Sequence, residues 1–233
     1  MQDVQLETRT LREQAYRTIK DFILKNVFLP GEDFSISSLA GALGISQTPV
    51  REALGRLSAD GLIDYEPHKR LRVAAITEED VRQAYEVRKL LEPYAASLVA
   101  SSVSTDADLE KNLWTLYEKA KGICETAVDL VDFESYLSVD LELNDIFLKV
   151  SGHTLFSEVL GFVSDRSLRI RTFLEAVYKT SPNNMVHVIT KEHLQIIEAL
   201  LKGDPAKTQT RVRRHLNNGE TRTLKAIKNK LNV

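Results

Sequence analysis

Apolar residues in the N-terminal third of the chain recur every three or four positions, which predicts three short amphipathic helices. The first is expected over 11–27, the second ends at Leu43, and the third begins after Ser46 as its cap. Two short apolar runs, 62–65 and 71–73, then predict a two-stranded hairpin. Three helices and a hairpin in this order indicate a winged helix–turn–helix.

The tight link between the second and third helices makes the third the candidate recognition helix. Its outward face carries polar residues suited to base and phosphate contacts: Gln47, Thr48, Arg51, Glu52 and Arg56. The tip of the hairpin adds a cationic cluster suited to phosphates or the minor groove: His68, Lys69, Arg70 and Arg72. For any one helix a solvated polar surface is the commoner interpretation, so the prediction of DNA binding depends on the whole series of elements.

Residues 76–233 show helical periodicity without a useful length of strand-like alternation. A start resembling a capping box at Thr77 introduces a long helix to about Ser102. Further helices are expected over 106–128, 131–150, 155–178, 186–202 and 205–230. The fold is therefore expected to be mainly α, with a winged helix–turn–helix in residues 1–75 joined to an all-helical bundle of about six helices in residues 76–233.

A sparse set of potential metal ligands falls in the helical part. Asp140 and Asn144 lie four residues apart and share a helix face, while His193 and His215 lie on the last two helices. One carboxylate, one amide oxygen and two imidazoles suit a borderline divalent ion such as Zn²⁺, Ni²⁺ or Mn²⁺. From spacing alone, a buried histidine is more often a satisfied core residue. The other two histidines here are expected at the surface or in loops: His153 and His187.

Charge and composition narrow the class of protein. The 233 residues carry a net charge of −2, which excludes a uniformly basic coat, although residues 205–233 hold eight basic side chains and one acidic one. That basic end is either a solvated last helix or a contact for nucleic acid. The single cysteine, Cys124, excludes an intrachain disulfide framework. No signal peptide or membrane span is evident, so a soluble, cytoplasmic protein without a membrane partner is expected.

The N-terminal motif resembles a known family. The stretch LPGEDFSISSLAGALGISQTPVREALGRLSADGLI, above all its core TPVREALGRLSADGL, is similar to the N-terminal domain of the GntR family of bacterial transcription regulators. The resemblance implies DNA-facing residues at the start of the recognition helix: Ser46, Gln47, Thr48 and Arg51. Gln47 stands where Arg is usual and Arg70 where a wing glycine is usual, which bears on the operator sequence.

The helical part resembles the FadR-type, FCD branch of the same family. The similarity lies in EVRKLLEPYAASLVA, VDLELNDIFLKVSGHTLF and EHLQIIEALLKGDPAKTQTRVRRHL. In that branch an Asp, a His one helical turn later and two further His commonly hold a metal. Asp140, His193 and His215 match these positions, and Asn144 stands where the first His is usual. The resemblance therefore implies a divalent metal cofactor.

The same resemblance implies the kind of effector. A metal with three or four protein ligands keeps open positions, and in the family these accept a carboxylate of a small organic acid. Arginines would complete such a site, and the candidates are Arg88 and Arg169. For Arg88, an ion pair with Glu92 is the alternative interpretation. Arg166 and Arg171 remain further candidates.

The expected function is that of a ligand-responsive transcription regulator, not an enzyme. As a homodimer it would bind a palindromic operator in double-stranded DNA, with its affinity controlled by a small carboxylate in the helical domain. One alternative keeps the DNA-binding domain but gives the effector pocket no metal, and another leaves the bundle a purely dimerising role. A metal-dependent hydrolase is a further alternative, disfavoured because no catalytic motif such as HExxH is present.

Overall fold

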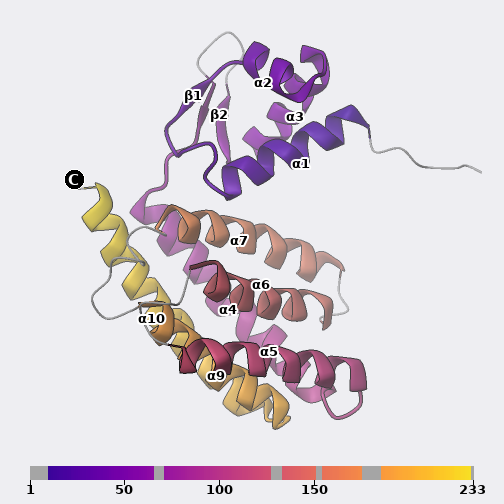
Figure 1. Ribbon diagram of the computed structural model, residues 1–233, viewed down its shortest axis with the longest axis vertical. Helices are drawn as coiled ribbons and strands as arrows, with labels where there is room; N and C mark the ends of the chain where they lie inside the picture. Colours follow the sequence, from indigo (N-terminus) through magenta and orange to yellow (C-terminus); the bar gives the residue numbers. More distant parts are fainter. Residues whose placement is uncertain (1–9, 66–70, 127–132, 151–153, 175–184, 232–233) are drawn as a thin grey trace, which may run out of the picture. The chain divides into compact units, whose positions relative to one another are not determined.

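The computed structural model describes residues 10–65, 71–126, 133–150, 154–174 and 185–231 (Figure 1). The chain divides into two compact units, Met1–Ile76 and Thr77–Val233. Each unit has an apolar core of its own, and helices make up most of the described residues of both.

The N-terminal unit contains, in order, α1 (Leu11–Leu24), β1 (Asp33–Phe34), α2 (Ile36–Leu43), α3 (Gln47–Ala59), β2 (Ile63–Tyr65) and β3 (Leu71–Val73). The Thr10 and Ser35 hydroxyls cap α1 and α2 by accepting from the backbone N–H groups of Glu13 and Ser38. Gly44, at φ 66°, ends α2 in the left-handed conformation that favours glycine. Helices α1 and α3 pack against each other, which leaves the polar face of α3 outside.

The sheet of this unit differs from the predicted two-stranded hairpin. Its three antiparallel strands lie in the order β1-β3-β2, so β3 pairs with both neighbours. Arg72 on β3 donates to both carboxylate oxygens of Asp33, its partner in register on β1, at 2.8 and 3.2 Å. The sequence prediction missed β1 because two residues are too few to show alternation. Helix α1 also ends at Leu24, before the predicted end at 27.

The C-terminal unit contains α4 (Glu78–Ser102), α5 (Ala107–Glu125), α6 (Phe133–Val150), α7 (Thr154–Phe173), α9 (Met185–Leu201) and α10 (Pro205–Leu231). The predicted capping box is present, since Thr77 accepts from the Asp80 N–H and Asp80 accepts from the Thr77 N–H. The predicted mainly α fold, a winged helix–turn–helix joined to a helical bundle, is confirmed, with the third strand as its correction.

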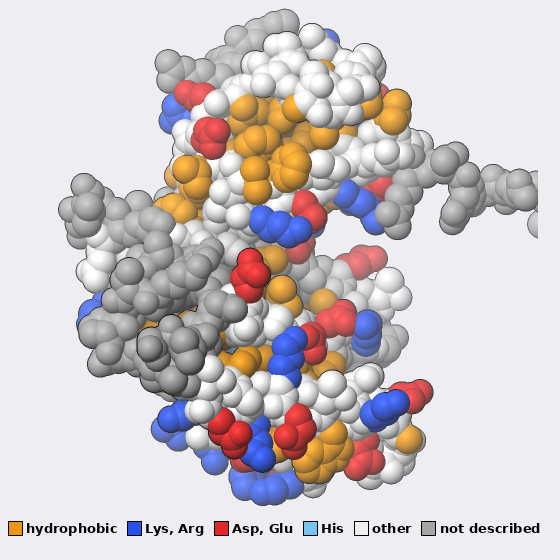
Figure 2. Space-filling model, in the orientation of Figure 1, with side chains coloured by type: hydrophobic (Ala, Val, Ile, Leu, Met, Phe, Trp, Pro, Cys, Tyr) orange, Lys and Arg blue, Asp and Glu red, His pale blue; other side chains and the backbone are white. Residues whose placement is uncertain are grey.

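Helix α4 is central to this unit, because it packs against α6, α7, α9 and α10. Its contact with α10 is close where the Tyr85 hydroxyl lies 3.1 Å from Thr223 Oγ1. A Cβ on Gly219 would lie 3.0 Å from that hydroxyl oxygen, so glycine permits the approach. On the face drawn in Figure 2, acidic and basic side chains are interspersed over the helical unit. No helix in the described ranges is long and apolar enough to cross a membrane.

Candidate functional site

Three of the predicted metal ligands meet inside the helical unit. Asp140 comes from α6, His193 from α9 and His215 from α10, and one ligand atom of each lies within 4.8 Å of the others. The exposed fractions are 3% for Asp140, 1% for His193 and 9% for His215. Helix packing thus brings one carboxylate and two imidazoles from distant parts of the sequence into a single buried cluster, the Asp140–His193–His215 cluster.

The Asp140 carboxylate is contacted by three neighbours. Arg171 on α7 approaches both oxygens, with Nη2 2.9 Å from Oδ2 and Nη1 3.2 Å from Oδ1. The Asn144 amide nitrogen donates to Oδ2 at 3.3 Å, and His193 Nε2 lies 3.4 Å from Oδ1. Burial raises the pKa of this carboxyl, but Arg171 and His193 outweigh it and hold the pKa well below its usual range. Asp140 is therefore ionised at neutral pH.

His215 is oriented by a second carboxylate, that of Glu192. Glu192 Oε2 lies 2.8 Å from His215 Nδ1, and the carboxylate also accepts from Asn218 and from both terminal nitrogens of Arg222 at 2.7–2.8 Å. Burial lowers the pKa of His215 to about 4 despite its hydrogen bond to Glu192, so the ring is neutral at pH 7. Because an ionised carboxylate only accepts, Nδ1 carries the proton and Nε2 offers the lone pair.

The ring of His193 completes the cluster. It stacks on Tyr136, with ring centroids 6.0 Å apart and an interplanar angle of 5°, and its centroid lies 4.7 Å from that of His215. Within the described part of the chain, His193 Nδ1 has no hydrogen-bond partner. An ionised carboxylate, the neutral imidazole of His215 and the imidazole of His193 fit the donor set of a borderline divalent ion.

Both predicted effector arginines are buried. Arg88 on α4 pairs with Glu92 one turn later, with Nη2 3.3 Å from Oε2, so the ion-pair interpretation describes its contact here. Burial lowers the pKa of Arg88, but the Glu92 charge outweighs burial and leaves the pKa raised, which keeps the guanidinium charged. Arg169 on α7 is 7% exposed. Of the other two candidates, Arg171 contacts Asp140, and Arg166 lies 4.6 Å from a phenylalanine ring centroid.

The residues predicted to face DNA at the start of α3 are exposed: Ser46, Gln47, Thr48 and Arg51. Arg51 Nη2 donates to Gln47 Oε1 at 3.1 Å, so the two predicted base-reading side chains lie side by side. Ser46 takes the N-cap position without a side-chain capping bond. The opposite face of α3 is buried against the core of the unit through Val50, Ala53, Leu54 and Leu57.

Other cations predicted to face DNA are engaged within the N-terminal unit. Arg56 Nη1 donates to Glu13 Oε2 at 2.9 Å, and its guanidinium lies 3.8 Å from the centroid of the Tyr16 ring. Arg72 is paired with Asp33 across the sheet. A DNA contact by either arginine has to compete with these exposed ion pairs. The remaining wing residues lie outside the described residues: His68, Lys69 and Arg70.

Sequence reasoning missed Glu192 and Arg222 and gave Arg171 no specific partner. The contact of Arg171 with Asp140 spans 31 residues and depends on how α6 and α7 pack, which no local pattern reveals. A signal for Glu192 was present, because Arg222 follows His215 by two helical turns and therefore shares its face of α10. Two hydrogen-bonding side chains on one helix face can share an acceptor, and in the structure that acceptor is Glu192.

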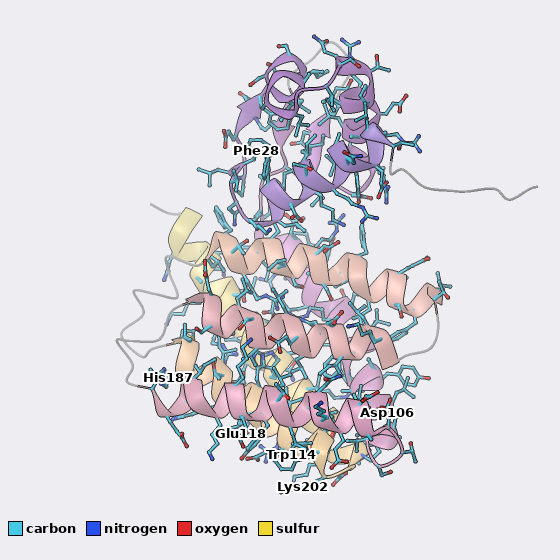
Figure 3. The ribbon with its side chains drawn as sticks, turned by 45° about the vertical axis from the view of Figure 1, so that its right-hand side comes forward. Phe28, Asp106, Trp114, Glu118, His187 and Lys202 are labelled. Carbon is cyan, nitrogen blue, oxygen red and sulfur yellow. The ribbon has the colours of Figure 1, made fainter. Side chains whose placement is uncertain are left out.

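The expectation that His187 is a surface or loop residue is wrong. His187 is part of α9, is 8% exposed, and its Nε2 lies 2.9 Å from the carbonyl oxygen of Thr126 (Figure 3). That carbonyl follows the end of α5, where backbone carbonyls lack helical donors. The burial of His187 therefore follows from a tertiary contact that sequence spacing does not show. His153 lies outside the described residues.

A winged helix–turn–helix followed by a helical unit with a buried polar cluster defines a class of two-domain DNA-binding regulators. Residues 11–73 match the family model described as bacterial regulatory proteins, gntR family, and residues 83–218 match the FCD domain. The chain belongs to the GntR family of bacterial regulators and carries the FCD domain, as the sequence resemblance implied. These families consist of transcription regulators rather than enzymes, which confirms that prediction as well.

Individual relatives extend over most of the chain. It is 30% identical over 210 residues to the HTH-type transcriptional regulator LutR of Bacillus subtilis, covering 82% of this chain and 91% of the relative. It is 26% identical over 205 residues to the uncharacterized HTH-type transcriptional regulator YdhC of the same organism, covering 88% and 87%. The solved structure of E. coli McbR/YncC has the same fold, with a TM-score of 0.73 at 19% identity, covering 93% and 98%.

Replacing Glu192 by alanine is expected to destabilise the metal-free protein. The change removes the acceptor of the His215 Nδ1–H and of the Asn218 amide, which costs roughly 1–3 kcal/mol. The matched control is Glu142→Ala, which removes an exposed ion pair with Lys119 and costs below about 1 kcal/mol. Denaturant unfolding measures both, and equal stabilities of the two variants would contradict the structural role of Glu192.

Proposed function

We propose that this GntR-family protein is a ligand-responsive transcription regulator that binds a palindromic operator as a homodimer. Its effector is a small carboxylate bound at a metal in the helical domain. The observation that carries the proposal is the convergence of Asp140, His193 and His215 in one buried cluster of the FCD domain. In such a regulator the effector changes the affinity for DNA by the same factor by which DNA changes the affinity for the effector.

The cluster supplies the residues that would hold a divalent ion, Zn²⁺, Ni²⁺ or Mn²⁺. Asp140 offers a carboxylate oxygen, and His193 and His215 each offer an imidazole nitrogen. Asn144, one turn after Asp140, remains the candidate for a fourth ligand through its carbonyl oxygen. When bound, the ion supplies open positions that accept a carboxylate oxygen of the effector.

Buried arginines favour an acid as the effector. Arg88 and Arg169 are 3% and 7% exposed, and a guanidinium binds a carboxylate through two parallel hydrogen bonds. A buried guanidinium also requires an anionic partner. Glu92 fills that role for Arg88, so an effector bound there has to replace Glu92 as its partner.

The contacts of Asp140 favour one rival, a regulator whose effector pocket contains no metal. Arg171 already compensates the Asp140 charge, and Asn144, in place of the usual His, donates its amide nitrogen to the same carboxylate. In this rival the effector is recognised by arginines and other polar groups alone. Metal content separates the two proposals.

Elemental analysis of the full chain, purified without a metal-affinity tag, is expected to find about one Zn, Ni or Mn atom per chain. His193→Ala is expected to lose this metal because one of only two imidazole ligands disappears. The matched control is His187→Ala, which removes a buried histidine outside the cluster and is expected to keep the metal. Wild-type protein that stays metal-free after incubation with these ions would favour the metal-free rival.

The exposed start of α3 supports the operator-binding part of the proposal. Gln47 and Arg51 are one turn apart and hydrogen-bonded to each other, and each side chain can bond bidentately to a purine edge. Thr48 beside them suits a phosphate or a thymine methyl group. We infer that these residues read the operator in the major groove.

Arg51→Ala is expected to weaken binding to the specific operator by roughly 1–3 kcal/mol, because a bidentate contact to a base is lost. The control is Lys25→Ala, which removes an exposed cation of the same unit next to the end of α1. Fluorescence anisotropy on operator and random DNA measures both variants. If Arg51→Ala weakens both DNAs equally, Arg51 contacts phosphate and does not read sequence.

Exposed apolar side chains on two adjoining helices support the homodimer. Leu155, Val159 and Phe162 follow each other at helical spacing on α7 and are 73%, 41% and 44% exposed. Leu90 and Tyr94 of α4 are 70% and 48% exposed, and α4 packs against α7. A dimer with two-fold symmetry uses the same surface patch of both copies. In the proposed homodimer the second copy would cover this apolar surface.

Phe162→Glu is expected to shift the protein from dimer to monomer, because it places a charge in the apolar contact. The matched control is Trp114→Glu, which changes an exposed aromatic residue on the outer side of α5 and is expected to leave the dimer intact (Figure 3). Light scattering coupled to size exclusion measures the molecular mass. A dimer of unchanged stability in Phe162→Glu would show that the two copies meet elsewhere.

A further inference from the structure

The guanidinium of Arg171 contacts both oxygens of Asp140, the carboxylate that would bind the proposed metal. Nη2 lies 2.9 Å from Oδ2 of Asp140, and Nη1 lies 3.2 Å from Oδ1. The exposed fractions of the two side chains are 6% and 4%, so water screens neither charge. Each group thus compensates the charge of the other inside the helical unit.

A metal in the cluster has to use an oxygen that Arg171 already contacts. Oδ1 is the oxygen that lies 3.4 Å from His193 Nε2, and it also receives Arg171 Nη1. Oδ2 is no open alternative, because Arg171 Nη2 and the Asn144 amide nitrogen both contact it. A dication and a guanidinium on one buried carboxylate also repel each other, because the interior screens charges weakly.

We propose that Arg171 is the counter-ion of the metal-free domain and competes with the metal for Asp140. This inference rests on the proposed metal site and concerns its regulation. The domain then has two charge-compensated states, one with Arg171 on Asp140 and one with the metal there. Metal binding has to separate a buried ion pair, so Arg171 lowers the metal affinity of the cluster below that of its three ligands alone.

A neighbour of the Asp140 carboxylate also favours the metal-free state. Asn144, at the position one turn after Asp140, adds a donor to the carboxylate and no imidazole to the metal. It therefore stabilises the state in which Arg171 holds Asp140. The carboxylate is thus surrounded by donors that the metal-free state uses and that a metal has to displace.

The test compares Co²⁺ binding by full-length wild type, Arg171→Met and Arg171→Lys after chelator treatment, followed by the visible absorption of the bound ion. We expect Arg171→Met to bind Co²⁺ roughly tenfold more tightly or better, because the competing charge is gone. Arg171→Lys keeps the charge but not the two-pronged contact, and is expected to fall between wild type and Arg171→Met. The control Lys149→Met removes an exposed cation near the end of α6, the helix that carries Asp140, and is expected to bind Co²⁺ as wild type does.

Equal or weaker Co²⁺ binding by Arg171→Met would overturn the competition while leaving the metal site itself intact. If wild type binds no Co²⁺ and Arg171→Met does, the competition is supported and the resident metal is not. Binding by no variant would overturn both proposals.

Arg171→Met leaves Asp140 without its counter-ion and therefore needs a check of folding. Thermal unfolding with and without Co²⁺ provides it, and the melting temperature of Arg171→Met is expected to rise more on Co²⁺ addition than that of wild type. A variant that Co²⁺ does not stabilise, or stabilises less than wild type, would overturn the competition.

Discussion

The buried charge of Asp140 is the constraint on which the helical domain's site depends. A carboxylate inside a protein requires both a counter-charge and hydrogen bonds, or it destabilises the fold. Arg171 of α7, Asn144 of α6 and His193 of α9 provide them here. Because these neighbours come from three helices, the interactions that satisfy the carboxylate also hold those helices together. The site is therefore part of the core, and any ligand that enters it has to preserve the balance of charge.

The second carboxylate, Glu192, extends the same principle to the last helix. Glu192 accepts hydrogen bonds from three side chains of α10, which joins α9 to α10. Burial raises the pKa of the Glu192 carboxyl, but Arg222 and His215 outweigh burial and hold that pKa well below its usual range. One of these contacts fixes the proton of His215 on Nδ1. The two imidazoles thus lie between two ionised carboxylates. For His215 this arrangement makes the Nε2 lone pair available in the interior on an uncharged ring.

Local physics was sufficient to predict the helices, and insufficient for the contacts that define the site. The tight link between α2 and α3 and the Thr77 capping box involve residues close in sequence, and both were predicted from the residues alone. Strand β1 was missed because two residues show no alternation, and the Arg72 partner of Asp33 lies 39 residues later. Residue chemistry named the three metal-ligand candidates, but spacing alone favoured ordinary core residues, and the family resemblance changed that weighting. Arg171 could not be assigned to Asp140, because that pairing is decided by the packing of two helices.

Helix α4 provides the covalent connection between the cluster's surroundings and the DNA-binding unit. It begins at Glu78, directly after the N-terminal unit ends, and its capping box holds that start in place. About two turns further on, Tyr85 contacts Thr223 of α10, the helix that carries His215, and Arg88 follows on the next turn. The contacts of α4 with α10 thus lie within about three helical turns of the residue at which α4 begins. Linkage makes any coupling between two sites reciprocal, so under the two proposals operator binding at α3 and the competition for the buried carboxylate would belong to one equilibrium.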